Sequence, residues 1–355
     1  MKKELWKGNE AIAEAAIRAG CDCFFGYPIT PQNEIPEYMS LNLPKAGGVF
    51  VQSESELAAI NMVYGASASG KRAMTSSSSP GVSLKQEGIS FLACAELPAV
   101  IVNVMRGGPG LGSIQPSQAD YYQATRGGGN GDYRTIVLAP CNIQEAVDLT
   151  QDAFDLADRY RNPVVLLADG MIGQMMEPIR WNERSRPSRP DKPWAAGGRG
   201  KRDHNNFITS LLIDAQDCER HNLYMQEKYD RIQEQEIRWQ ERETQDCEIL
   251  LVAYGTPARI AMTAVEQLRA EGIAAGLFRP ITLWPFPATP LAHLAAQERV
   301  KAVLTVEMSL GQMIDDVRLA VEGRKPVHFY GRSGGSTPTV AEIVTAAEEA
   351  LKGGK

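Results

Sequence analysis

The segment VIVNVMRGGPGLG, residues 100–112, decides the fold of the first half of the chain. It opens on residues that are apolar apart from one asparagine, and an arginine and a glycine-rich segment follow. An almost continuously apolar run predicts a strand that helices cover on both faces. Similar short runs occupy residues 21–27, 49–52, 72–75, 135–139 and 164–168.

Amphipathic segments alternate with these runs and predict helices at residues 10–19, 56–69 and 142–160. Gly20 and Gly70 follow the first two segments as helix-ending glycines. Asn142, with Glu145 three residues later, fits a capping box at the start of the third. Alternating strands and helices indicate a parallel, doubly wound sheet. We therefore predict an α/β domain over residues 1–176.

Residues 177–245 interrupt this pattern. They are first rich in proline, arginine and glycine, Pro187 included, and then run as a charged helical segment from about Gln216 to Glu243. We predict a linker and a long helix that is solvated or faces a partner. A disordered tract is the alternative, although apolar residues in the linker indicate that it docks somewhere; they are Phe207, Leu211, Leu212 and Ile213.

Residues 246–355 return to alternating strands and helices. Strands are expected at 248–254, 274–279, 301–306 and 326–330, and helices near 257–271, 289–297, 312–321 and 339–351. This segment predicts a second, smaller α/β domain with its own core.

Composition excludes several classes of protein. The chain has 355 residues, with 37 basic and 43 acidic side chains and a formal net charge of -6, so nucleic acid is not an expected partner. The 6 cysteines include no C-x-x-C pair, which argues against zinc ribbons and iron–sulfur ligation in this chain. No apolar run reaches the roughly 20 residues of a membrane span, and we expect a cytoplasmic protein.

Four features follow predicted strands, where open α/β sheets bind ligands. Residues 26–31 hold the Thr30 hydroxyl between prolines, and an ordinary proline-rich turn is the alternative. Glu56 begins a helix. Its carboxylate either is there only because the helix dipole stabilises an acidic residue at this position, or points as a buried group into a cleft. Residues 75–81 form either a serine-rich helix cap or a loop whose N–H groups bind a polar ligand.

Arg106 is the fourth feature. It leaves the strongest strand for a glycine-rich loop, where a guanidinium binds a carboxylate through two parallel hydrogen bonds. A solvated arginine or an ordinary ion pair is the alternative. Each of the four signals is weak by itself, but their order on successive strands is informative.

The ordered motifs resemble one family closely. They are Y-P-I-T-P at 27–31, E-S-E-L-A-A-I-N at 54–61 with Gly65, T-S-S-S-S-P-G at 75–81, M-R-G-G-P-G-L-G at 105–112 and R-G-G-G-N-G-D-Y-R at 126–134. This set resembles the alpha subunit of 2-oxoacid:ferredoxin oxidoreductases, most of all the branched-chain (3-methyl-2-oxobutanoate) type. The resemblance implies a thiamine-diphosphate pyrimidine-binding domain followed by a domain similar to the transketolase C-terminal domain.

The resemblance also implies roles for single residues. Glu56, rather than Glu54, lies nine residues before the glycine and would hydrogen-bond N1′ of the thiamine pyrimidine, favouring its imino tautomer. Thr30 would bind the substrate and assist catalysis, and Arg106 would hold the substrate carboxylate. Pro28 and Ser78 would be further cofactor contacts.

One expected motif is missing. Thiamine-diphosphate enzymes hold Mg²⁺ and the diphosphate with Gly-Asp-Gly followed by Asn-Asn, and the nearest imitation, Ala168-Asp169-Gly170 with Asn205-Asn206, has too wide a spacing. We expect no metal site in this chain. A beta subunit would bring the diphosphate and Mg²⁺, while gamma and ferredoxin-like subunits would bring iron–sulfur clusters for electron transfer to ferredoxin.

The resulting hypothesis is a subunit that takes part in oxidising a 2-oxoacid to acyl-coenzyme A and CO2, with electrons passing to ferredoxin. A non-oxidative thiamine-dependent decarboxylase subunit, a 2-oxoglutarate-specific member of the same family and a scaffold subunit with a degenerate site are the alternatives. In Ser79-Pro80 the chain also departs from the family's usual Gly-Pro, which bears on the conformation of the third loop.

Overall fold

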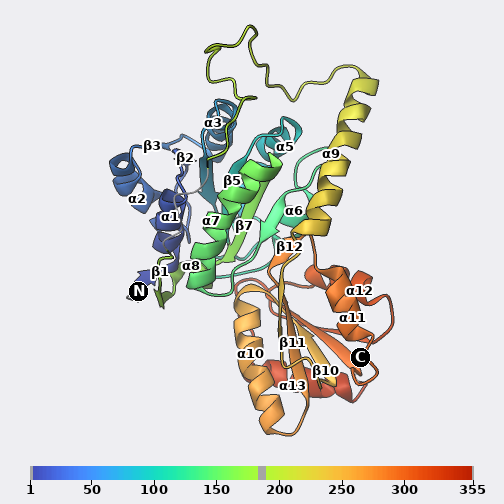
Figure 1. Cartoon of the computed structure of the whole chain (residues 1–355). Coiled ribbons are helices and arrows are strands. Elements are labelled where there is room, and N and C mark those ends of the chain that lie inside the picture. Colours follow the sequence, from blue (N-terminus) through green and yellow to red (C-terminus); the bar gives the residue numbers. More distant parts are fainter. Residues whose placement is uncertain (1–2, 183–188, 354–355) are drawn as a thin grey trace.

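The computed structural model describes residues 3–182 and 189–353. Two α/β units lie end to end, and a long helix with an extended segment runs beside the first of them (Figure 1). Pro187 and the outermost residues of the predicted domains lie outside the described residues.

The first unit is built on a seven-stranded sheet in the order β12-β6-β7-β5-β4-β2-β3. Its members pair in parallel except β12, which is antiparallel to β6. Their bounds are β2 (Cys23–Gly26), β3 (Val49–Gln52), β4 (Ala73–Ser77), β5 (Ala99–Met105), β6 (Ile136–Leu138), β7 (Pro163–Asp169) and β12 (Thr282–Trp284). The predicted parallel α/β class is confirmed.

Helices cover this sheet. Every residue of β5 and β7 is buried, as the apolar runs predicted for strands covered on both faces. Helix α1 packs on α7, and α3 packs on α5. The helices are α1 (Gly8–Arg18), α2 (Glu34–Asn42), α3 (Glu56–Ala68), α4 (Ser79–Ser83), α5 (Gln86–Cys94), α6 (Tyr121–Arg126), α7 (Ile143–Tyr160) and α8 (Gly170–Gln174), with a 3-10 turn at Pro44–Ala46.

The predicted helix ends are mostly correct. Gly20 and Gly70 adopt φ of +80° and +89°, the left-handed conformation expected after a helix. The Asn142 side chain accepts a hydrogen bond from the backbone N–H of Glu145 at 2.8 Å. The reciprocal half of the predicted capping box is wrong, because the Glu145 carboxylate accepts instead from the Cys141 N–H and pairs with Arg279.

The second unit has a five-stranded sheet in the order β14-β13-β10-β11-β9. The strands are β9 (Trp239–Arg242), β10 (Ile249–Val252), β11 (Ala275–Pro280), β13 (Ala302–Glu307) and β14 (Val327–Gly331). Helices α10 (Gly255–Ala270), α11 (Ala288–Ala295), α12 (Met313–Val321) and α13 (Val340–Leu351) accompany them. Apolar residues of α10, α13 and the central strands form a separate core, so the predicted α/β character of this segment is confirmed.

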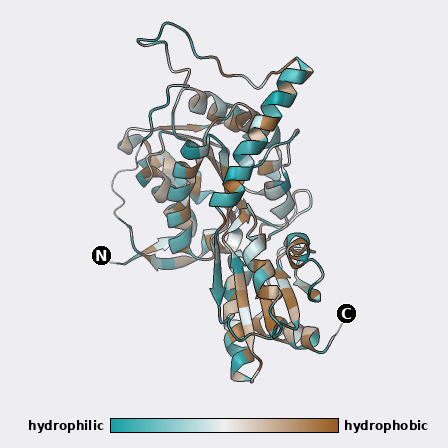
Figure 2. Ribbon diagram, turned by 45° about the vertical axis from the view of Figure 1, so that its right-hand side comes forward, coloured by the Kyte–Doolittle hydropathy of each residue, from teal (hydrophilic) through white to brown (hydrophobic). Residues whose placement is uncertain are grey.

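Helix α9 (Ala215–Gln235) is largely hydrophilic, as Figure 2 shows, but it docks on the first unit. Met225, Lys228, Tyr229 and Ile232 are buried along one face, and Tyr229 packs edge-on against Trp284. The prediction of a solvated helix missed this narrow stripe. The predicted end at Glu243 is also wrong, because residues 239–242 pair with β11 as the antiparallel edge strand β9.

The segment before α9 docks as expected, but Trp194 and Ile208 are the residues that pack against the core. Phe207, Leu211 and Ile213 are exposed to 87%, 70% and 87% of their surface. Strand β1 (Glu4–Lys7) pairs with β8 (Met176–Ile179) in a two-stranded ribbon, which sequence analysis did not predict. The divisions at residues 177 and 246 remain a prediction, and β12, from the later segment, completes the sheet of the first unit.

Candidate functional site

Four loops meet at the carboxyl edge of the first sheet. Thr30, Glu56, Ser78 and Arg106 follow β2, β3, β4 and β5, which are neighbours in the order β5-β4-β2-β3. The loops are in contact, since the Arg106 guanidinium reaches the Thr30 carbonyl and Ser79 bonds the Arg106 backbone. The sequence therefore located one continuous edge where ligands bind in sheets of this kind.

Glu56 is the first residue of α3, and Ser55 caps this helix. Its side chain belongs to the buried polar groups, with 6% exposure. Among the described residues, none donates a hydrogen bond to its carboxylate. A Cβ on Gly81 would lie 2.6 Å from Glu56 Oε1 and 2.2 Å from Ser77 Oγ, so any other residue at position 81 would force these side chains to move.

Two hydroxyls beside Glu56 are also without a partner. The Oγ atoms of Ser77 and Ser78 are buried and make no hydrogen bond within the described part of the chain. Ser76 next to them is satisfied, because its hydroxyl donates to Gln32 Oε1 at 2.5 Å. The orphaned hydroxyls and the Glu56 carboxylate give this edge donors and acceptors that a polar heterocycle could use.

Ser79 holds the third loop in a conformation that favours glycine, with φ of +20°. Its hydroxyl donates to Asp120 Oδ2 at 2.6 Å and accepts from the Arg106 N–H at 3.0 Å, while its own N–H donates to Asn103 Oδ1. Burial raises the pKa of Asp120, opposed by its bonds to Ser79 and Asn103. These bonds offset the cost of the left-handed backbone conformation at Ser79.

Arg106 is 8% exposed. Its Nη1 donates to the Thr30 carbonyl at 2.8 Å and its Nη2 to the Leu111 carbonyl at 3.0 Å, while Nε is buried without a partner. The guanidinium is thus held by main-chain oxygens rather than by an acid. On the edge of the guanidinium that Nε and Nη2 form, only Nη2 donates a hydrogen bond.

Thr30 and Pro28 lie at the surface of the same edge. Both residues are exposed, and the Thr30 hydroxyl accepts from Asn33 at a long 3.4 Å. Neither side chain is therefore committed to the fold.

Lys85 is the residue that sequence analysis missed. It lies between α4 and α5, is completely buried, and its ammonium donates to Thr75 Oγ1 at 2.6 Å and the Ser76 carbonyl at 3.0 Å. Burial lowers the pKa of Lys85 to about 7, and the charge of Glu56 opposes that shift. Gln86 and Glu87 follow Lys85 at the start of α5, so the local sequence gave no signal of its burial.

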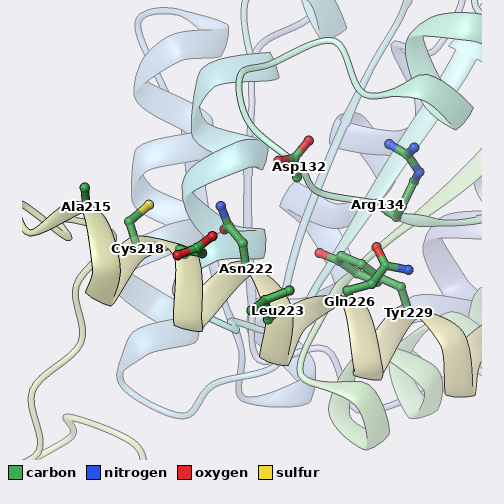
Figure 3. A pocket seen from close by; sticks show the side chains of 9 residues that line it. Asp132, Arg134, Ala215, Cys218, Asn222, Leu223, Gln226 and Tyr229 are labelled. Atoms are coloured by element: carbon green, nitrogen blue, oxygen red, sulfur yellow. The ribbon is translucent and has the colours of Figure 1, made fainter.

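A separate cavity of about 590 Å³ lies between α9 and the 126–134 segment (Figure 3). Asp132 and Arg134 line it from one side, and Cys218, Asn222 and Tyr229 line it from α9. Two residues of the R-G-G-G-N-G-D-Y-R motif, Asp132 and Arg134, thus face α9, and none of the four loop residues at the Glu56 edge lines this cavity.

The imitation of the Mg²⁺ motif has a structural role. The buried Asp169 carboxylate caps α8 and accepts from the N–H and hydroxyl of Thr256, joining the two units. Within residues 3–182 and 189–353, metal-ligating side chains do not gather in threes. Every helix in that part of the chain is also too short or too polar to cross a membrane.

The fold and this edge define the class: a two-unit α/β chain of the kind that binds thiamine diphosphate. Residues 14–245 match the family "Pyruvate flavodoxin/ferredoxin oxidoreductase, thiamine diP-bdg", and residues 247–343 match "Pyruvate:ferredoxin oxidoreductase core domain II". The chain belongs to this family of 2-oxoacid:ferredoxin oxidoreductases, which confirms the resemblance to its alpha subunits.

Curated relatives match nearly the full chain. Ketoisovalerate oxidoreductase subunit VorB of Methanothermobacter marburgensis is 53% identical over 98% of both chains. The 2-oxoglutarate synthase subunit KorA of Methanothermobacter thermautotrophicus is 40% identical over 95% of this chain and 96% of its own.

A solved structure has the same fold. It is the 2-oxoglutarate:ferredoxin oxidoreductase from Magnetococcus marinus with 2-oxoglutarate, coenzyme A and succinyl-CoA bound, with a TM-score of 0.86 at 26% identity. The match covers 99% of this chain and 65% of that one.

Proposed function

We propose that this chain is the alpha subunit of an oxidoreductase that converts a branched-chain 2-oxoacid to acyl-coenzyme A and CO2 and passes electrons to ferredoxin. The observation that carries the proposal is Glu56, a buried carboxylate at a strand end with no donor in the described structure. The 53% identity to a ketoisovalerate oxidoreductase subunit supports the branched-chain substrate.

The residues at the Glu56 edge suit the pyrimidine end of thiamine diphosphate. When bound, this cofactor supplies an acidic ring carbon that adds to a 2-oxo group and stabilises the loss of CO2. Glu56 accepts a hydrogen bond from, or shares a proton with, the N1′ nitrogen of the ring. Ser78 offers an unused buried hydroxyl, and Pro28, exposed at the same sheet edge, is the further cofactor contact in this proposal.

Arg106 binds the substrate carboxylate in this proposal. Nε and Nη2 lie on the same edge of a guanidinium and match the two oxygens of a carboxylate. An incoming carboxylate would displace only the Leu111 carbonyl and would satisfy Nε, while the 2.8 Å bond from Nη1 to the Thr30 carbonyl is kept. Thr30 is the second substrate contact in this proposal, and the bond from Nη1 to its carbonyl supports a position close to Arg106.

The chain provides half of a site. A beta subunit brings Mg²⁺ and the diphosphate-binding residues, and gamma and ferredoxin-like subunits bring iron–sulfur clusters. The six cysteines support this division, because all of them are free and dispersed through the fold. A cytoplasmic location fits such unpaired thiols.

Two alternatives keep the same cofactor. The first is a 2-oxoglutarate-specific enzyme, and the observation behind it is the 40% identity to a 2-oxoglutarate synthase subunit. A non-oxidative decarboxylase would release CO2 without reducing an acceptor.

The test is reconstitution of this chain with its partner subunits, followed by assays with 3-methyl-2-oxobutanoate and 2-oxoglutarate. We expect coenzyme A-dependent reduction of a viologen dye, with the higher kcat/KM for the branched substrate. A preference for 2-oxoglutarate would overturn the substrate assignment, and CO2 release without dye reduction would indicate the decarboxylase. Turnover by this chain alone would contradict the half-site arrangement.

A further inference from the structure

The segment that follows Arg106, residues 107–118, leaves the first sheet and folds back on itself; we call it the Arg106 loop. The Gly107 N–H donates to the Gln115 carbonyl at 2.9 Å and so closes the loop. Within it, the Leu111 carbonyl accepts from Arg106 Nη2 at 3.0 Å. A displacement of the loop would therefore move one of the two carbonyls that hold the guanidinium.

Gln118, at the end of the Arg106 loop, is bonded to the second unit through its backbone and its side chain. The residue is completely buried. Its N–H donates to the Met308 carbonyl at 2.8 Å, and its Oε1 accepts from the Met308 N–H at 3.0 Å. Its Nε2 donates to the Tyr254 carbonyl at 2.9 Å. Because Gln118 pairs both backbone groups of Met308, this attachment fixes the end of the loop in one place on the second unit.

A pair of glycines in the second unit packs against the same loop. Gly334 and Gly335 follow β14, and Gly335 has φ of +105°. A Cβ on Gly335 would lie 2.5 Å from Gln115 Cβ and 2.6 Å from Ser113 Oγ. In the opposite direction, a Cβ on Gly107 would lie 2.8 Å from the carbonyl carbon of Gly334. The two segments approach this closely because neither carries a side chain at the contact.

These contacts lie at the carboxyl edge of the second sheet. Tyr254, Met308 and Gly334 follow β10, β13 and β14, which are neighbouring parallel strands of that sheet. Such strand ends are where open α/β sheets bind ligands. In this protein a loop of the first unit occupies them, so the edge of the second sheet supports part of the candidate site in the first.

We propose that Gln118 and Gly335 are positioning residues for Arg106: through them the second unit holds the Arg106 loop where the guanidinium can bind the substrate carboxylate. The inference rests on the proposed function, in which Arg106 makes that contact. Both residues act through the loop and not by touching substrate or cofactor. The second unit thereby contributes to recognition of the 2-oxoacid.

The first test is Q118M, which keeps the length of the side chain and removes its two hydrogen bonds. In the assembled enzyme we expect KM for the 2-oxoacid to rise about five- to tenfold with little change in kcat, because a displaced binding group loses part of its contact. A KM equal to that of wild type would overturn the role of Gln118.

R279M is the matched control for Q118M. Arg279 of β11 bonds Glu145 of α7, so this variant also removes a buried contact between the two units, and the Arg106 loop takes no part in it. Both variants should lower the melting temperature, and only Q118M should raise KM. An equal rise of KM in R279M would mean that the effect of Q118M is a general loss of packing, and would overturn the proposal.

G335A tests the other contact, and G272A is its control. Gly272 also lies in the second unit, with φ of +85° and open space where a Cβ would be, so alanine there brings similar backbone strain without pressing on the loop. We expect G335A to raise KM about fivefold and G272A to leave it unchanged. A normal KM in G335A, or the same rise in both variants, would overturn the role of Gly335.

The double variant R106M/Q118M separates this inference from the function on which it rests. If Gln118 acts through Arg106, the KM of the double variant equals that of R106M. A KM raised by the product of the two single effects would mean that Gln118 acts by another route, and would overturn the proposal. A normal KM in R106M would overturn the proposed role of Arg106, whereas a raised KM in R106M with a normal one in Q118M would overturn only the role of Gln118.

Discussion

Two buried glutamates follow strands in this molecule, and their surroundings are opposite. Glu307 ends β13 in the second unit, is 0% exposed, and accepts hydrogen bonds from the Ser309 hydroxyl and three backbone N–H groups that lead into α12. Glu56 begins α3 in the first unit, is 6% exposed, and accepts none from the described residues.

The difference separates a structural acid from an acid that is available to a ligand. The Glu307 carboxylate satisfies N–H groups that a helix start leaves unpaired. Burial raises the pKa of Glu307 and those bonds oppose the shift. The Glu56 carboxylate accepts no such bonds from the described residues, and the unpartnered hydroxyls of Ser77 and Ser78 and the unpartnered Nε of Arg106 belong to the neighbouring loops of the same sheet edge. Unsatisfied polar groups at a sheet edge where open α/β sheets bind ligands fit a site whose hydrogen bonds are completed by a ligand.

The largest expected effect is that of E56Q. An amide accepts a proton far less readily than a carboxylate, so exchange of the ring proton of bound thiamine diphosphate should fall on the order of 100-fold or more. Glu54, two residues earlier and exposed, supplies the control. Isotope exchange of the ring proton in the assembled enzyme, followed by nuclear magnetic resonance, measures both variants. Equal exchange rates in E56Q and E54Q would mean that Glu56 does not act on the cofactor, and the contrast with the structural acid Glu307 would be lost.

A smaller effect is expected at Arg106. R106M should raise KM for the 2-oxoacid by about 10- to 100-fold, because a bidentate charged contact is lost. Arg279 is the matched control, since its three guanidinium nitrogens already bond Glu145 and Gln240. R279M should lower the melting temperature of the enzyme and leave KM unchanged. Steady-state kinetics measure both variants, and a normal KM in R106M contradicts the assignment.

E307Q should affect stability alone. Its amide nitrogen would face N–H groups that need an acceptor, which costs about 1–3 kcal/mol of unfolding free energy. Denaturant unfolding of the assembled enzyme measures this loss, and proton exchange at the cofactor should stay at the wild-type rate. A large fall in exchange would mean that Glu307 is not merely structural.

The sequence predicted the fold where the signal was local. The runs at 100–105 and 164–168 became β5 and β7, which are buried throughout. The prediction from sequence failed where a strand pairs with a partner that is distant in the sequence. Residues 239–242 read as charged helix and became a strand because β11 offers an open edge, and β12 joins a sheet whose other strands lie over 100 residues earlier.

In the candidate site, too, the sequence revealed residues that a local motif marks and missed features that depend on packing. Thr30, Glu56 and Arg106 were predicted because each follows a strand and matches a motif, and the sheet brings these successive strand ends to one edge. Lys85 and the bonds of Ser79 to Asp120 and Asn103 were missed, because burial and hydrogen-bond partners depend on packing that a motif does not encode.

A structure of the assembled enzyme with thiamine diphosphate bound tests the central claim most directly. The account predicts a Glu56 oxygen about 2.6–3.2 Å from the pyrimidine N1′, with the diphosphate and Mg²⁺ held by residues of another subunit. A Glu56 side chain turned to bulk water, or a diphosphate bound by this chain, would contradict it.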